Sequence, residues 1–240
     1  MKKTKYGRVL LKLSGEALKG KGGTGIDFDT TTLIAEQIKE LMKLDLQVAI
    51  VIGAGNIFRG VPASANTNID RVPADYIGML ATIMNSIALE NVLKSIGCPA
   101  VVQTSIPMNT IAEPYTNRKA LQHLKDGKVL IFGGGTGSPF FTTDTTAALR
   151  ASEIKADALL KATKVNGIYS EDPNKNPNAT KFNNISYEEC LKKRLKIMDS
   201  TAFSMCMDNN IPIVVFNFSN KKNLLNVVCG DVSAATVVGD

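Results

Sequence analysis

Short apolar runs alternate with longer helical patterns along this chain, and no other feature limits its fold as strongly. Runs rich in Val, Ile and Leu predict strands at residues 8–13, 47–52, 100–104, 128–132, 158–162 and 213–217. Apolar residues at helical spacing predict helices at residues 31–43, 73–96, 117–124, 145–154, 187–192, 201–209 and 222–228. Strands joined by helices favour a mainly parallel sheet covered by helices, so the sequence predicts an α/β fold.

The charge balance admits three classes of partner: nucleic acid, an anionic membrane surface or an anionic small molecule. The net charge is +6, but the 28 Lys and Arg residues are spread along the whole chain. The densest groups, Lys2-Lys3-Thr4-Lys5 and Lys192-Lys193-Arg194, are short and carry no interleaved stacking aromatics. The apolar run at 9–13 is too short for a membrane span or a signal-peptide core. We therefore expect no nucleic-acid partner and no membrane association.

The cysteines and the single histidine are spaced too widely for a zinc site. No two of the 4 cysteines form a CxxC pair, and His123 stands in a predicted helix away from the glycine turns. We expect no metal site built from protein side chains. Scattered cysteines are typical of reduced thiols, which favours a cytoplasmic protein.

Glycines follow four of the predicted strands. The segments are Ser14-Gly15, Gly53-Ala54-Gly55-Asn56, Gly133-Gly134-Gly135-Thr136-Gly137-Ser138 and Gly167. In open parallel sheets, ligands bind beyond the carboxyl ends of the strands, where these turns would meet. Glycine lets the backbone approach a phosphate and point its N–H groups at it. The pattern predicts a continuous phosphate-binding floor.

The familiar phosphate-binding motifs do not account for this floor. The chain has no Gly-x-x-x-x-Gly-Lys-Ser/Thr loop and no His-Arg-Asp or Asp-Phe-Gly triplet. The dinucleotide-binding pattern fails because Phe58 stands where its third glycine should be. Phosphate handling here would depend on several separated turns.

Three further features favour phosphoryl transfer, which needs cations around the transferring group. Lys12 lies in an apolar run just before Ser14-Gly15, and it either meets an anion or faces solvent from an edge strand. Arg59 follows the second glycine turn, either gripping phosphate or exposed in a loop. Asp144, after Thr142 and Thr143, opens a predicted helix; these residues cap the helix, bind phosphate, or do both, and Asp144 could organise lysines or a metal.

The ordered set of motifs resembles the bacterial uridylate (UMP) kinases, which belong to the amino-acid-kinase fold group. The resemblance covers nearly the whole chain without large gaps. Its motifs are Leu11-Lys12-Leu13-Ser14-Gly15-Glu16, Val51-Ile52-Gly53-Ala54-Gly55-Asn56, Phe58-Arg59-Gly60, Gly78-Met79-Leu80-Ala81-Thr82, Gly135-Thr136-Gly137-Ser138-Pro139-Phe140-Phe141-Thr142-Thr143-Asp144, Leu160-Lys161-Ala162-Thr163-Lys164-Val165-Asn166-Gly167-Ile168-Tyr169, Asp172-Pro173 and Lys196-Ile197-Met198-Asp199. The resemblance implies a three-layer αβα sandwich with a mainly parallel central sheet. It implies one domain, residues 1–240, with an acceptor-binding part at about 1–155 and an ATP-binding part at about 156–240.

The resemblance also implies a reaction and its residues. The γ-phosphoryl group of ATP, bound with Mg²⁺, would pass directly to UMP, giving UDP and ADP in pyrimidine nucleotide biosynthesis. The catalytic residues would be Lys12, Arg59, Asp144 and Lys161. ATP would contact Lys12, Leu13, Ser14, Gly15, Gly55, Arg59, Thr163, Tyr169 and Asp172. UMP would contact Ala54, Asp75, Thr136, Gly137, Ser138, Pro139, Phe140, Phe141, Thr142 and Thr143.

Assembly and regulation follow only from the resemblance, which implies a homo-oligomer, a hexamer, that responds to GTP and UTP. The glycine-rich segment 20–27 matches the region that carries GTP activation in the family, but it suits a plain flexible connection equally well. The apolar predicted helix at 73–96 fits a subunit interface or a core helix. Ala54 departs from the family's triple-glycine turn, and its methyl group would crowd a phosphate unless its φ is negative.

Two alternatives stay open. A kinase of the same fold group that forms an acyl phosphate on a carboxylate or carbamate would share Lys12 and the glycine turns. A non-catalytic nucleotide sensor would share the nucleotide pockets. Asp75 and the segment 136–143 favour a nucleoside monophosphate as the acceptor, because its ribose and phosphate need such hydrogen-bonding groups.

Overall fold

The computed structural model describes residues 3–58, 69–173, 175–176 and 178–239. Its strands are β1 (Arg8–Leu13), β2 (Gln47–Ile52), β3 (Ala100–Thr104), β4 (Glu113–Pro114), β5 (Val129–Gly133), β6 (Ala158–Thr163), β7 (Asn184–Ile185), β8 (Ile213–Asn217) and β9 (Ala235–Val238). Its α-helices are α1 (Phe28–Leu41), α3 (Arg71–Ser95), α4 (Asn117–Lys125), α5 (Thr143–Glu153), α6 (Tyr187–Lys192), α7 (Ser200–Asp208) and α8 (Asn223–Val228). Two 3₁₀ turns, η1 (Gly15–Leu18) and η2 (Gly20–Gly22), follow β1.

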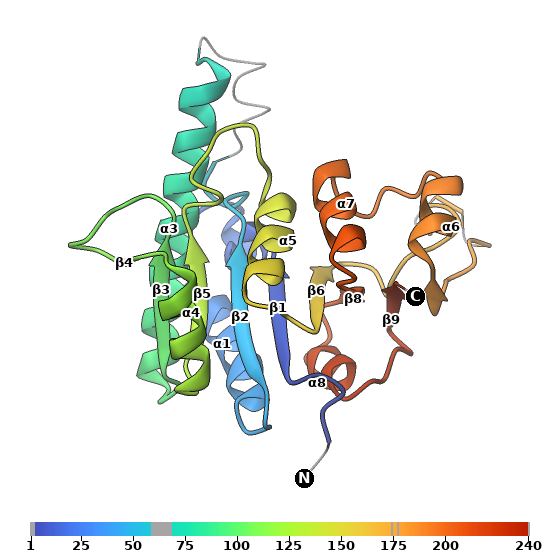
Figure 1. The fold of residues 1–240 in the computed structure, drawn as a ribbon, viewed down its shortest axis with the longest axis horizontal. Helices are drawn as coiled ribbons and strands as arrows, with labels where there is room; N and C mark the ends of the chain where they lie inside the picture. The colour runs from blue at the N-terminus through green and yellow to red at the C-terminus, as the bar shows by residue number, and fades with distance from the viewer. Residues whose placement is uncertain (1–2, 59–68, 174, 177, 240) are drawn as a thin grey trace.

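Within these described residues the strands form one sheet in the order β4-β3-β5-β2-β1-β6-β8-β9-β7. All neighbouring strands are parallel except β8 and β9, which run antiparallel. β1 therefore lies in the middle, with β2 on one side and β6 on the other (Figure 1). The mainly parallel sheet that the alternation predicted is confirmed.

The sheet is buried on both faces, which is why its strands are apolar at nearly every position. Successive side chains of a strand point to opposite faces. In β1, Leu11 packs into the cluster that α1, α3 and α8 cover, whereas Leu10 packs into the cluster that α4, α5, α6 and α7 cover (Figure 1). The two clusters make the three-layer αβα sandwich, so the predicted fold class is confirmed.

Polar caps determine where the helices nearest the sheet's carboxyl edge begin. Asp27 caps α1 by accepting a hydrogen bond from Thr30 N at 2.7 Å. Thr142 caps α5 through Asp144 N and Thr145 N, and Asp199 caps α7 through Ala202 N. Such a cap satisfies backbone N–H groups that have no partner inside the helix.

The predicted elements match the structure to within three residues at each end. Helix α1 begins at Phe28 and not at residue 31, because Asp27 caps it. The strands β4, β7 and β9 were missed. β4 and β7 have two residues each and carry no periodic signal, while β9 is a four-residue run at the end of the chain.

Helix α3 has one face that is buried in the core and another that carries exposed apolar side chains. Met79, Ile83 and Leu89 are buried against the sheet, but Leu80 is 43% and Met84 55% exposed. By length and composition alone, α3 could cross a membrane, but half of its most apolar stretch is buried inside the protein. That burial is what a core helix of a folded domain shows.

Candidate active site

Two lysines lie side by side in the middle of the sheet. The parallel register of β1 and β6 pairs Lys12 directly with Lys161. Both point to the same face as Leu10 and Leu159, toward α5, because side chains two residues apart share a face. Each lysine side chain is 14% exposed. Since β1 is a central strand, the edge-strand alternative for Lys12 is wrong.

Asp144, in the first turn of α5, lies between the two ammonium groups. Its carboxylate is 2.8 Å from Lys12 Nζ through Oδ1 and 2.6 Å from Lys161 Nζ through Oδ2. Lys161 also donates a hydrogen bond to the carbonyl oxygen of Ile197 at 2.6 Å. The structure thus brings together three of the four residues expected to be catalytic. Arg59, the fourth, lies outside the described residues.

Burial and charge oppose each other in this cluster. Burial by itself would raise the pKa of Asp144, but the attraction of Lys12 and Lys161 outweighs it and holds that pKa below its ordinary value. Burial lowers the pKa of Lys161, and Asp144 offsets part of the effect. Asp144 is therefore an ionised carboxylate at neutral pH.

The glycine turns that follow β1 and β2 contact each other next to this cluster. Gly53 N donates to the carbonyl oxygen of Leu13 at 3.0 Å, which extends the pairing of β1 and β2 into the turns. A Cβ on Gly15 would stand 2.4 Å from Gly53 O and 2.7 Å from Gly55 N, so only glycine fits there. Ser14 caps the turn η1 by accepting from Glu16 N. These contacts support the predicted phosphate floor at its centre.

A cavity of ≈ 250 Å³ lies at the start of α5, and we call it the acceptor-side cavity because several residues expected to bind UMP line it. The expected UMP-binding residues that line it are Ala54, Asp75, Ser138, Phe141, Thr142 and Thr143, and Gly55, expected on the ATP side, joins them. Ala54 is not among the described residues with positive φ, so its methyl group fits the turn without strain.

Asp75 has two partners in this cavity. It accepts a hydrogen bond from Phe140 N at 2.8 Å and pairs with Arg71 Nε at 2.7 Å. Arg71 also lines the cavity; it was not predicted, because a single arginine at the start of a helix carries no distinctive sequence signal.

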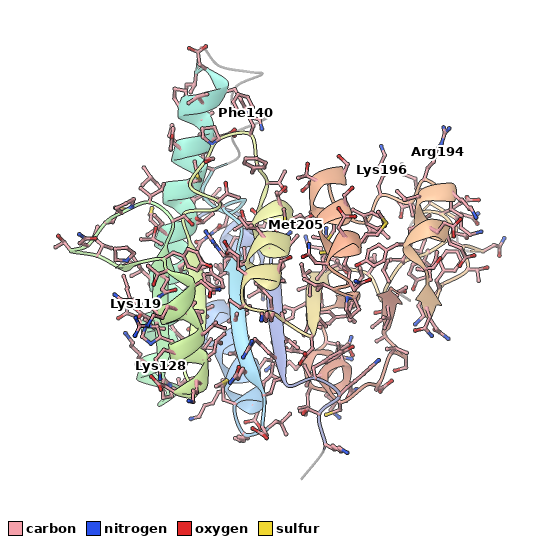
Figure 2. The ribbon with its side chains drawn as sticks, viewed as in Figure 1. Lys119, Lys128, Phe140, Arg194, Lys196 and Met205 are labelled. Atoms are coloured by element: carbon pink, nitrogen blue, oxygen red, sulfur yellow. The ribbon has the colours of Figure 1, made fainter. Side chains whose placement is uncertain are left out.

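The loop from β5 to α5 holds the remaining expected acceptor residues. Thr136 Oγ1 accepts from Ser138 N at 3.2 Å, and Gly137 packs against Ser105 with a φ of 84°. Phe140, labelled in Figure 2, is 64% exposed and has a φ of 71°. The guanidinium carbon of Arg71 lies over its ring, 5.4 Å from the ring centroid. Thr136, Gly137, Pro139 and Phe140 do not line the cavity itself. The loop lines the cavity through Ser138, Phe141 and Thr142, and Thr143 at the start of α5 joins them.

A second cavity, of ≈ 550 Å³, lies on the other side of the cluster. Lys161 and three expected ATP-binding residues, Thr163, Tyr169 and Asp172, line it. Its rim carries Lys193, Arg194 and Lys196, and the last two reach outward beside α6 and α7 (Figure 2). Two residues of the basic run noted in the sequence, Lys193 and Arg194, therefore border a cavity.

The described residues contain no group of three or more His, Cys, Asp or Glu side chains close enough to hold a metal ion. Mg²⁺ in phosphoryl-transfer sites is held by one or two carboxylates together with substrate phosphates and water. Both carboxylate oxygens of Asp144 are paired with lysines, so among the described residues this carboxylate is not open to a metal ion.

Comparison with known proteins gives the family. The model of the amino acid kinase family matches residues 7–217. The chain belongs to the amino acid kinase family. Within this family it is 53% identical over 237 residues to the uridylate kinase of Limosilactobacillus reuteri, covering 98% of both chains.

Solved structures of this family agree with the fold. The UMP kinase of Bacillus anthracis superposes with a TM-score of 0.93 at 40% identity, over 98% of this chain and 96% of that one. The UMP kinase of Ureaplasma parvum gives a TM-score of 0.92 at 36% identity over the whole of both chains.

Asp144→Asn removes the charge that lies between the two lysines of this amino acid kinase. We expect the free energy of unfolding at pH 7 to fall by about 3–5 kcal/mol, because a buried ammonium pair loses its counter-ion. The stabilisation from the lowered pKa of Asp144 is present above the ordinary value of 3.8 and is lost as the pH falls through the folded-state value. The difference between variant and wild type should therefore shrink below about pH 4.

Urea unfolding from pH 3 to pH 8 measures this difference. The control is Asp45→Asn, which alters an exposed aspartate and should leave stability nearly unchanged. An Asp144→Asn protein as stable as wild type at pH 7 would show that the lysines need no counter-ion.

Proposed function

We propose that this chain is a UMP kinase, which transfers the γ-phosphoryl group of ATP to the phosphate of UMP and yields UDP and ADP. The observation that carries the proposal is the position of the Lys12–Asp144–Lys161 cluster. Thr143, just before Asp144, lines the acceptor-side cavity, and Lys161 lines the other cavity. A cationic cluster between two cavities is what a reaction joining two anionic substrates needs. The curated and solved relatives, all uridylate kinases, support the same substrate.

UMP occupies the acceptor-side cavity in this proposal. Asp75 accepts hydrogen bonds from the ribose hydroxyls, after exchanging one of its present partners, Arg71 or Phe140 N. Thr142, Thr143 and the backbone of residues 136–141 bind the base and phosphate. The positive end of the α5 helix dipole favours an anion there.

ATP occupies the second cavity, where Thr163, Tyr169 and Asp172 hold the adenine and ribose. The triphosphate then runs toward Ser14 and Gly15. The ammonium and guanidinium groups of Lys193, Arg194 and Lys196 at the rim favour this polyanion. The division into an acceptor-binding part before residue 155 and an ATP-binding part after it stays part of the proposal.

The transfer itself needs positioning and charge, and no covalent enzyme intermediate. An oxygen of the UMP phosphate forms a bond to the γ-phosphorus while the bond to the β,γ-bridging oxygen breaks, leaving its electron pair on ADP. Lys12 and Lys161 stabilise the negative charge on the transferring group, and Asp144 holds both ammonium groups in place. The backbone of Gly15 and Gly55 lies beneath the phosphates. A Mg²⁺ ion held by the nucleotide phosphates would supply further neutralisation of charge.

We further propose that the protein is a cytoplasmic homo-oligomer, a hexamer, regulated by GTP and UTP. α3 supports the assembly, because one stretch of this helix leaves five apolar side chains between 39% and 55% exposed: Val72, Tyr76, Ile77, Leu80 and Met84. Apolar side chains gathered this way on a surface mark an interaction site. A second copy of the chain is the partner that fits.

A panel of acceptors tests the substrate. ADP release should be rapid with UMP and at least about 100-fold slower, as kcat/KM, with CMP, GMP, aspartate or acetylglutamate. CMP and GMP carry a different base, and the two amino acids lack both base and ribose. A coupled assay with ATP and Mg²⁺ measures it, and repeating it with GTP and UTP tests regulation. Turnover with an amino acid in place of UMP would support the acyl-phosphate alternative.

Lys12→Ala distinguishes a catalytic protein from a non-catalytic nucleotide sensor. The variant should lower kcat at least about 100-fold by removing a charge that acts on the transferring group. UMP binding, measured by calorimetry, should change little, since Lys12 does not line the acceptor cavity. Lys125→Ala, an exposed lysine on α4, is the control. Unchanged turnover in Lys12→Ala would remove this residue from the mechanism.

Met84→Glu tests the assembly. A carboxylate on the outer face of α3 is costly to bury against a second copy, so the variant should sediment as smaller species than wild type. Lys125→Glu, the same added residue on α4, should sediment like wild type. Identical sedimentation of Met84→Glu and wild type would place the subunit contact elsewhere.

A further inference from the structure

The motif Gly78-Met79-Leu80-Ala81-Thr82 takes part in the family resemblance, and its Gly78, Met79 and Thr82 line the acceptor-side cavity. It lies on α3, whose buried face turns toward the glycine turns. Two polar side chains on that face, Thr82 and Asn85, are 7% and 0% exposed. A buried polar side chain is costly unless it is hydrogen-bonded, so their partners indicate what they do.

Asn85 holds the glycine turn that follows β2. Its Nδ2 donates to Gly53 O at 2.8 Å and to Asn56 Oδ1 at 2.8 Å. Asn56 returns a hydrogen bond from its own Nδ2 to Asn85 Oδ1 at 2.9 Å and gives its other donor to Gly25 O at 2.8 Å. All four amide donors are used, and the two backbone carbonyls determine which way each amide faces.

The same amide pair also lies against the turn that follows β1, at Gly15. A Cβ on Gly15 would stand 2.5 Å from Asn56 Oδ1, as well as 2.4 Å from Gly53 O. A shift of the amide pair would therefore displace the turn after β2 and the turn after β1 together.

Thr82, one helical turn before Asn85, binds the turn that follows β5. Its Oγ1 accepts a hydrogen bond from Gly134 N at 2.9 Å and donates to the carbonyl oxygen of Met79 at 2.6 Å. Gly134 has a φ of 78°, and a Cβ there would meet Thr104 Oγ1 at 2.8 Å. The turn after β5 is thus held between Thr104 and Thr82, and its course into residues 135–138 depends on this contact.

We propose that Thr82 and Asn85 are positioning residues for the phosphoryl transfer, holding from one helix the two glycine turns between which acceptor and donor phosphates meet. This inference rests on the proposed UMP kinase activity. Thr82 lines the acceptor-side cavity, but its hydroxyl is already bonded to Gly134 N and Met79 O, and both donors of the Asn85 amide are used within the protein. They act through Gly53 and Gly134, whose backbone groups they bind.

The kinetic parameters for each substrate test the inference. Thr82→Val removes the hydroxyl at nearly constant volume, and it should raise the KM for UMP at least about 10-fold while the KM for ATP stays within about 3-fold. Asn85→Asp replaces two donors by an acceptor that faces Gly53 O and Asn56 Oδ1, and it should raise both KM values and lower kcat at least about 10-fold. Thr82→Ser keeps the hydroxyl and should restore the KM for UMP.

Matched controls come from the same helix. Ser86→Ala removes a buried hydroxyl that donates only to the carbonyl oxygen of Thr82, and Asn91→Asp makes the same exchange as Asn85→Asp at an exposed position. Both should keep wild-type kinetics within about 3-fold. Circular dichroism and thermal unfolding check the fold of each variant. If Thr82→Val or Asn85→Asp does not fold, Thr82→Ala or Asn85→Ser replaces it, and the same changes in KM and kcat are expected.

The outcomes separate this inference from the proposed function. A wild-type protein that does not phosphorylate UMP contradicts the function. An active wild type with an unchanged UMP KM in Thr82→Val contradicts only the inference. Equal losses in Ser86→Ala and Thr82→Val would also contradict it, because α3 would then act only through the stability of the fold.

Discussion

Two ammonium groups on neighbouring central strands repel each other and lose hydration, so the sheet tolerates Lys12 and Lys161 only with an anion between them. Asp144 is that anion, at 2.8 and 2.6 Å from the two nitrogens. Its place in the first turn of α5 ties the start of this helix to β1 and β6. The parallel register that pairs the two lysines therefore also decides where α5 begins and where the loop before it must pass.

The same register brings the backbone turns together. β1 and β2 end at the same edge, and the bond from Gly53 N to Leu13 O continues their ladder into the turns. Because Gly15 has no side chain, the turn after β2 can lie against it, and α3 holds both that turn and the one after β5. The charged side chains and the backbone turns thus meet in one small region, to which β1, β2, α3, the segment from β5 to α5, and β6 all contribute.

Much of this was predictable from sequence, since it depends on local patterns. Apolar runs predicted the central strands, and glycines after those runs predicted the edge where the cavities lie. Lys12 was ambiguous, because its partner Asp144 is 132 positions away in the chain and the strand order decides whether β1 is central or at an edge. Arg71, Asn85 and the basic rim around Arg194 were missed for the same reason: a lone arginine, a helical asparagine or a charged loop has meaning only once its distant neighbours are known. The roles of the expected substrate-binding residues stay predictions.

Asp199 shows how a motif residue without an obvious chemical role can still serve the site. It caps α7 through Ala202 N, and its carboxylate also accepts hydrogen bonds from the hydroxyls of Thr142 and Thr145 at the start of α5. Thr142 is itself the cap of α5, so one carboxylate joins the first turns of two helices. α7 follows the segment that lines the second cavity, and Thr142 lines the first. A rotation of α7 would therefore move the residue that caps α5, and with it Asp144 between its two lysines, so the geometry of the charge cluster depends on contacts from both ends of the chain.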